Sequence, residues 1–169
     1  MASKLQVDSI LPVDGAPTNG GGGIIQVVHG TATSETSQSF STTNFADTGL
    51  SATITPKFST SKILVTGYLS YYVDINADAS IEWNFAVCDG SDNILDGTTA
   101  TTRGYRANTV YQVGGKHPIN FLHSPSTTSA FTYKMRMNAV SSNGSGGVYC
   151  QVNGTANNIS RITLMEVSA

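Results

Sequence analysis

Two histidines are among the few side chains here whose type and spacing could support catalysis or metal binding. His117 and His123 lie six positions apart, so both face the same side of an extended strand. A metal ion held across that strand is one interpretation, and two surface histidines near loops are the other. Closed metal sites usually present more ligands at fixed spacing, which favours the surface interpretation.

Three aspartates, Asp89, Asp92 and Asp96, fall within a short stretch that could be a calcium loop. Calcium takes about six to eight oxygen ligands, and the glutamate that closes an EF-hand loop is missing here. Two tight turns, at Asp89-Gly-Ser and at Asp96-Gly97, explain the same residues through backbone geometry. The turns are therefore the favoured interpretation.

A catalytic site needs a nucleophile, a base and a group that orients the base, and no such set is evident. Glycoside cleavage would need a pair of carboxylates, but nothing in the sequence connects Glu82 with Glu166. The run Gly20–Gly23 precedes a strand and not a helix, so it does not fit a phosphate-binding loop. We therefore expect no enzyme, with no catalytic residue, no metal site and no cofactor.

The elements that must position these side chains are β-strands. Apolar and polar residues alternate most regularly in 63–73, 81–87 and 131–139, which gives each strand one apolar and one wet face. A polar Ser/Thr-rich stretch at 31–44 is predicted as a long loop pinned by Phe40 and Phe45. Weaker alternation predicts further strands at 24–30, 49–55, 98–103, 109–113, 119–123, 148–152 and 159–167. About ten strands and no helical periodicity indicate an all-β antiparallel sandwich or barrel.

The first 23 residues differ from the rest of the chain. They contain one short apolar patch, two prolines and the run Gly20–Gly23. Ordering each residue costs about 1–2 kcal/mol, so a segment this short cannot stabilise itself. We expect an extended anchor with a Gly-rich hinge over 1–23 and a β domain over 24–169. Leu5, Val7 and Ile10 are the predicted contacts of the anchor with a partner.

Arg103, Tyr105, Arg106 and Tyr111 form a candidate surface-binding cluster. Tyrosine and arginine are enriched in the hot spots of protein interfaces. An ordinary strand–turn–strand with solvated arginines explains the same residues.

The last predicted strand has apolar residues on both sides. Ile162 and Leu164 face one way, and Met165 faces the other. A strand that is covered on both faces lies centrally in a sheet or against a neighbouring subunit. These three residues are therefore a candidate subunit interface.

Charge and composition limit the classes of partner. Only 12% of the residues are charged and the formal net charge is −2, which does not favour a nucleic-acid partner. The longest uncharged stretch, 137–160, is rich in Ser, Asn and Gly, so we expect no membrane insertion. The N-terminus lacks the pattern of a secretion signal, and Cys88 and Cys150 are therefore expected to be free thiols.

Particular stretches of the chain resemble virion structural proteins of tailed bacteriophages, especially tail-fibre proteins of phages that infect cyanobacteria and marine bacteria. The first stretch is Ala2-Ser-Lys-Leu-Gln-Val-Asp-Ser-Ile10. The second is Thr48-Gly-Leu-Ser-Ala-Thr-Ile-Thr-Pro56, followed by Ser61-Lys-Ile-Leu-Val65. The closing Ile162-Thr-Leu-Met-Glu-Val167 also resembles the end of such domains.

This resemblance implies a jelly-roll-like β-sandwich, commonly a homotrimer, that is fixed to other virion proteins by its N-terminal segment. The expected protein is a non-enzymatic virion component assembled in the bacterial cytoplasm, namely a short fibre or knob on the tail or baseplate. It lacks the coiled-coil or β-helical shaft of long fibres. Two alternatives stay open: a trimeric capsid decoration protein, and a module that binds host-surface glycans.

Overall fold

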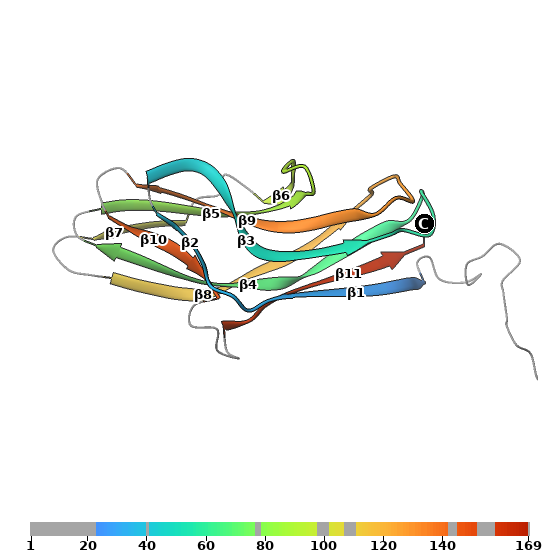
Figure 1. The fold of residues 1–169 in the computed structure, drawn as a ribbon, viewed down its shortest axis with the longest axis horizontal. Helices are drawn as coiled ribbons and strands as arrows, with labels where there is room; N and C mark the ends of the chain where they lie inside the picture. The colour runs from blue at the N-terminus through green and yellow to red at the C-terminus, as the bar shows by residue number, and fades with distance from the viewer. Residues whose placement is uncertain are drawn as a thin grey trace, which may run out of the picture.

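Two antiparallel β-sheets pack face to face in this computed structural model (Figure 1). The structure describes residues 23–39, 41–76, 79–97, 102–106, 111–141, 145–151 and 158–168. These residues form eleven strands and no α-helix. The strands are β1 (Ile24–Ala32), β2 (Thr36–Ser39), β3 (Ser41–Ile54), β4 (Lys62–Asn76), β5 (Ala79–Asp89), β6 (Ile94–Gly97), β7 (Thr102–Arg106), β8 (Tyr111–His123), β9 (Phe131–Ser141), β10 (Ser145–Cys150) and β11 (Ser160–Val167).

The first sheet, sheet A, has β4 at its centre. Its order is β1-β11-β4-β10-β2, and β8 pairs with the other edge of β4. β11 pairs with residues 62–68 of β4 and β10 with residues 71–76, so these two strands follow each other along one edge. β1 and β2 follow each other in the same way beside β11 and β10. Sheet A is therefore four strands wide.

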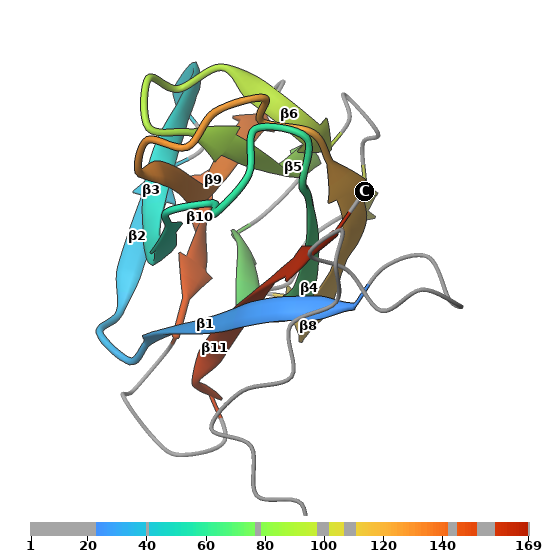
Figure 2. The same ribbon diagram turned by 90° about the vertical axis from the view of Figure 1, so that its right-hand side faces the viewer.

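The second sheet, sheet B, has the order β3-β9-β5-β6, and β7 also pairs with β5. β6 pairs with residues 86–88 of β5 and β7 with residues 79–83, so they too share one edge. Sheet B is again four strands wide. Figure 2 shows the sandwich from its C-terminal end, with β1 and β11 on one side and β5, β6 and β9 on the other.

The strand order is that of a jelly roll. Eleven strands, of which three end-to-end pairs each fill one position, make eight positions along the chain. Sheet A then has the order 1-8-3-6 and sheet B the order 2-7-4-5. Two Greek keys wound over two sheets give this arrangement. The expected all-β, jelly-roll-like antiparallel sandwich is confirmed.

The core lies between the sheets and consists of alternate residues from each strand. β4 contributes Ile63, Val65, Leu69 and Val73, none of which has exposed surface. β5 and β9 supply the facing layer, which is also buried: Trp83, Phe85, Val87, Tyr133, Met135 and Met137. The alternation predicted at 63–73, 81–87 and 131–139 is confirmed, and the two wet faces are the outer faces of the sandwich.

Two predicted boundaries are wrong. The predicted loop at 31–44 contains β2 and the start of β3, because Ser and Thr suit a strand at the sheet edge that pairs with β10 alone. The predicted break between the strands at 109–113 and 119–123, which contains Gly114 and Gly115, is also absent, since β8 pairs with β4 from Tyr111 to His123 without interruption. A Cβ at Gly115 would lie 3.4 Å from the Tyr71 hydroxyl oxygen, so Gly115 packs against that ring.

Candidate interaction surfaces

Strands β1 and β11 bring Gly23 and Ser168 together at one end of the sandwich. Gly23 N donates a hydrogen bond to Ser168 Oγ at 3.1 Å, and Ser168 N donates to Gly23 O at 3.1 Å. We call this the base end, and residues 1–22 join the domain there (Figure 1). The predicted anchor contacts Leu5, Val7 and Ile10 lie outside the described residues.

A buried carboxylate joins three segments at the base end. Glu166 has no exposed surface, and its Oε1 accepts hydrogen bonds from Lys57 N at 2.7 Å and Phe58 N at 3.3 Å. Its Oε2 accepts one from Gln26 Nε2. Burial alone would raise the pKa of Glu166, but these three hydrogen bonds, led by that of Gln26, outweigh it and hold the pKa below its ordinary value. Glu166 therefore has a structural role: its carboxylate stabilises the base end.

The predicted Arg–Tyr cluster is divided between the two sheets. β7 carries Arg103, Tyr105 and Arg106 along one edge of β5 in sheet B. Tyr111 is the first residue of β8, at the edge of sheet A. The two strands are consecutive in the chain, so the backbone of Arg106 and Tyr111 lies at the same end of the sandwich.

That end lies opposite the base end. At one end of β4, Lys62 pairs with Val167, and thirteen residues later Ile75 pairs with Tyr111. Thirteen residues of strand span roughly 43 Å at about 3.3 Å per residue. We call the far end, where β4 leads into β5, the distal end (Figure 1). β7 ends and β8 begins at this distal end, so the backbone of the Arg–Tyr cluster lies there.

The candidate interface residues on β11 have two different environments. Ile162 and Leu164 have no exposed surface and belong to the core between the sheets. β11 lies between β1 and β4, so its two apolar sides reflect a central strand. Met165 alternates with these core residues and is partly exposed on the outer face of sheet A. Of the three, Met165 alone has surface to offer a partner.

His117 and His123 each pack against aromatic side chains. The ring centroids of His117 and Phe85 lie 5.0 Å apart, and His123 Nδ1 lies 2.8 Å from the Tyr133 hydroxyl oxygen. Burial lowers the pKa of both histidines, so their neutral form is favoured. Neither is a fully exposed surface histidine. Within the described ranges, no group of three or more His, Cys, Asp or Glu side chains could hold a metal ion.

The acidic stretch forms one turn and one short strand. Asp89 Oδ1 accepts hydrogen bonds from Ser91 N at 2.8 Å and Asn93 N at 2.9 Å, and its Oδ2 accepts one from Asn93 Nδ2 at 2.8 Å. These bonds, led by that of the Asn93 side chain, lower the pKa of Asp89. The turn predicted at Asp89 is confirmed. Asp96 and Gly97 instead belong to β6.

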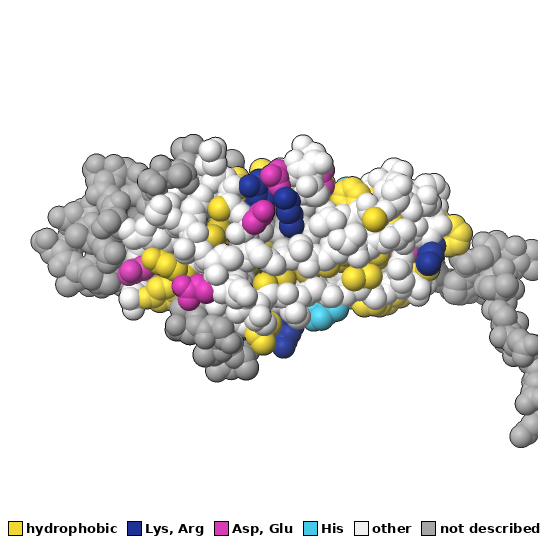
Figure 3. Space-filling model, in the orientation of Figure 1, with side chains coloured by type: hydrophobic (Ala, Val, Ile, Leu, Met, Phe, Trp, Pro, Cys, Tyr) yellow, Lys and Arg dark blue, Asp and Glu magenta, His cyan; other side chains and the backbone are white. Residues whose placement is uncertain are grey.

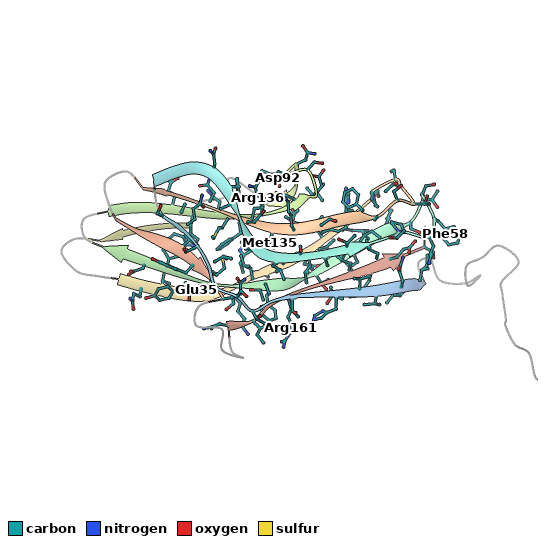
Figure 4. The ribbon with its side chains drawn as sticks, viewed as in Figure 1. Glu35, Phe58, Asp92, Met135, Arg136 and Arg161 are labelled. Atoms are coloured by element: carbon teal, nitrogen blue, oxygen red, sulfur yellow. The ribbon has the colours of Figure 1, made fainter. Side chains whose placement is uncertain are left out.

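Four charged side chains meet on the outer face of sheet B, a cluster that the sequence analysis missed (Figures 3 and 4). Arg136 Nε lies 3.1 Å from Asp47 Oδ1, and its Nη1 lies 3.1 Å from Asp92 Oδ2. Lys134 also contacts Asp92 and lies 3.8 Å from Asp47 Oδ1. The alternation of β9 placed Lys134 and Arg136 on its polar face. Their partners Asp47 and Asp92 come from distant segments that no local sequence pattern connects to β9.

The two cysteines are buried on different sheets. Cys88 lies on β5 of sheet B and Cys150 on β10 of sheet A, and both are free thiols as predicted. Burial raises the pKa of Cys150 to about 12, and it also raises the pKa of Cys88. Both thiols are therefore protonated at neutral pH, which suits packing and not nucleophilic chemistry.

No known family model matches this chain, and no curated protein matches it either. It is similar to solved structures of infectious bursal disease virus: the Gt strain at 14% identity and a TM-score of 0.42, and VP2 in T=1 particles at 12% and 0.41. These alignments cover 99% of this chain and 42% and 40% of those chains, so it spans about two fifths of their length. Such TM-scores are too low to establish a shared fold, and the fold assignment depends on the strand order alone.

No helix in the part of the chain that the structure describes is long and apolar enough to cross a membrane.

Proposed function

We propose that this chain is a non-enzymatic structural protein of a bacteriophage particle. In this proposal it is a short, homotrimeric tail fibre or knob, assembled in the bacterial cytoplasm and carried in the virion. Residues 1–23 attach it to another virion protein at the tail or baseplate, with Leu5, Val7 and Ile10 as the contacts. An extended segment of this kind binds by adding to a sheet edge or by lying in a groove.

The observation that carries the proposal is the placement of the two candidate surfaces. The anchor segment joins at Gly23, and the base there is braced by the hydrogen bonds of Ser168 and Glu166. The Arg–Tyr cluster lies where β7 ends and β8 begins, at the distal end, so a domain attached to the particle at its base would present this cluster outward. The resemblance of Ala2–Ile10 and Thr48–Val65 to phage virion proteins agrees with this orientation.

The proposal is tested by removing residues 1–22 and keeping Gly23 for its bonds to Ser168. We expect the truncated chain to fold with an unchanged melting temperature but to be absent from purified particles, because the domain keeps all its described contacts. A full-length variant with Leu5, Val7 and Ile10 replaced by Ser separates loss of contacts from loss of length. Truncated protein that still assembles onto particles would contradict the anchor.

Copy number distinguishes the tail from the capsid. A trimeric decoration protein would occur in hundreds of copies per particle, and a tail component in tens or fewer. Quantitative mass spectrometry of purified particles measures this number directly.

A further inference from the structure

Four apolar side chains lie in one line across the outer face of sheet A, near the base end. Val27 on β1 pairs with Met165 on β11, Met165 pairs with Leu64 on β4, and Leu64 pairs with Leu122 on β8. Neighbouring strands lie about 4.8 Å apart, so the four side chains form a continuous strip roughly 14 Å long.

This strip lies on the solvent side of the sheet. The residues that alternate with it, among them Ile63 and Leu164, are fully buried in the core. Val27 is 58% exposed and Leu122 is 54% exposed. Ile24, 60% exposed, pairs with Val167 beside the strip. The terminal patch comprises Ile24, Val27, Leu64, Leu122, Met165 and Val167.

The terminal patch gathers exposed apolar surface that is sparse elsewhere. Among the described residues five large hydrophobic side chains are exposed, and three of them, Ile24, Val27 and Leu122, belong to this patch. Single exposed apolar residues are ordinary, but a contiguous group on one face marks an interaction site.

A polar rim borders the terminal patch on the same face. The next line of paired residues is His29, Thr163, Thr66 and Asn120, and His29 Nδ1 lies 3.2 Å from Thr163 Oγ1. Beyond it, Arg161 Nη1 donates to the Tyr68 hydroxyl at 2.9 Å, and Figure 4 shows Arg161 on this outer face. An apolar centre with a hydrogen-bonding rim is the usual anatomy of a protein interface.

We propose that a second copy of this chain covers the terminal patch, so that the patches of a closed, symmetric oligomer face its rotation axis. This inference rests on the proposed function, because it identifies the surface that makes the homo-oligomer. The observation that selects a second copy is the point where residues 1–22 join the domain. Gly23 adjoins Ile24 of the patch, so copies that meet here release their anchors side by side.

Anchors that leave the oligomer side by side would bind simultaneously to the same particle. Each anchor offers few apolar residues, and its single affinity would be low. Once one anchor has bound, the others bind at a high effective concentration, which raises the overall affinity by about 10²–10⁴-fold. Oligomers formed through the terminal patch would therefore bind the particle through several anchors at once, which offsets the low affinity of each anchor.

The experiment compares Leu122→Lys with Ile94→Lys in the full chain, by light scattering and sedimentation velocity over a range of concentrations. Leu122 and Ile94 are 54% and 55% exposed, but Ile94 lies on β6 in the other sheet, so it is a matched control. We expect the unaltered protein and Ile94→Lys to be oligomers. Leu122→Lys should raise the dissociation constant at least about tenfold, because a charge replaces buried apolar area.

Val27→Lys, on the opposite side of the patch, should have the same effect, and thermal melts establish that each variant is folded. An unaltered chain that stays monomeric at about 100 µM, where even a weak specific oligomer would form, would overturn the inference. An oligomer that both patch variants leave intact would overturn it equally. Monomers that still attach to particles through residues 1–22 would leave the proposed function standing.

Discussion

One buried carboxylate joins segments of the base end that are distant in the sequence. Glu166 accepts hydrogen bonds from the side chain of Gln26 on β1 and from the backbone of Lys57 and Phe58 after β3. Because three donors point at this carboxyl group, the ionised form is the one that fits the folded state. The contribution of Glu166 to the free energy of unfolding should therefore depend on pH.

We predict that Glu166→Gln lowers the free energy of unfolding by about 2 kcal/mol at pH 7, because a donor amide replaces a charged acceptor. The folded-state pKa of Glu166 is lowered, so its contribution is present above the unfolded pKa of about 4.3 and is lost as the pH falls through the folded value. Urea unfolding of the parent and the variant from pH 7 to pH 3 measures the loss of stability and its dependence on pH.

The difference in unfolding free energy between Glu166→Gln and the parent should itself depend on pH. The gap between variant and parent should close at acid pH, where both lack the charge. A gap that stays constant from pH 7 to pH 3 would mean that the ionised carboxylate does not stabilise the base end.

At the scale of elements, one glycine lets an edge strand of sheet A approach sheet B. A Cβ added at Gly30 on β1 would lie 2.2 Å from Ser51 O on β3 and 3.0 Å from a methyl carbon of Ile162. The first contact is with backbone, which cannot move aside as a flexible side chain can. β1 and β3 therefore close this side of the sandwich only because no side chain stands between them.

Gly30→Ala should lower the free energy of unfolding by about 2–3 kcal/mol, the usual cost of forcing atoms into a packed site. Gly90→Ala is the matched control, because the nearest atom to its Cβ is 3.7 Å away. Chemical denaturation compares the two. Equal stabilities of the two variants would contradict the close approach of β1 and β3.

The strands were predictable where local patterns decide structure. β4, β5 and β9 are central strands, so their alternation reflects a core that each strand faces along its whole length. β2 and β6 were missed because they are four-residue edge strands: β2 is wholly polar, and β6 ends in the turn-like pair Asp96-Gly97. Their strand state depends on partners, β10 and β5, that are distant in the sequence.

The candidate surfaces were harder to predict than the strands. The sequence identified β11 as covered on both sides, but the same pattern arises from a central strand, which is where Ile162 and Leu164 lie. The line that joins Met165 with Val27, Leu64 and Leu122 depends on the register of four strands. The pattern of residues within one strand does not predict how that strand is aligned with its neighbours.

At the scale of the whole molecule, the base and distal ends have different candidate roles. The base end carries the junction with residues 1–22, and the Arg–Tyr cluster lies where β7 ends and β8 begins, at the distal end. A protein attached at its base would meet a host surface with its distal end. In the alternative in which this chain binds host-surface glycans, Arg103, Tyr105, Arg106 and Tyr111 would make the contact.

If the distal end binds glycans, replacing both Tyr105 and Arg106 by Ala should weaken binding on a glycan array by roughly 30-fold, the effect of losing about 2 kcal/mol at an interface hot spot. Lys57→Ala at the base end is the control and should bind as the parent does. Glycan binding that survives the double substitution would exclude this cluster as the contact surface.

The hydrogen bonds between Gly23 and Ser168 also make the jelly roll a module with adjoining ends. A domain of this kind can be grafted into a surface loop of an unrelated carrier protein without forcing the two sides of that loop apart. The same adjacency permits circular permutation through a short linker, with new ends opened in the connection between β4 and β5.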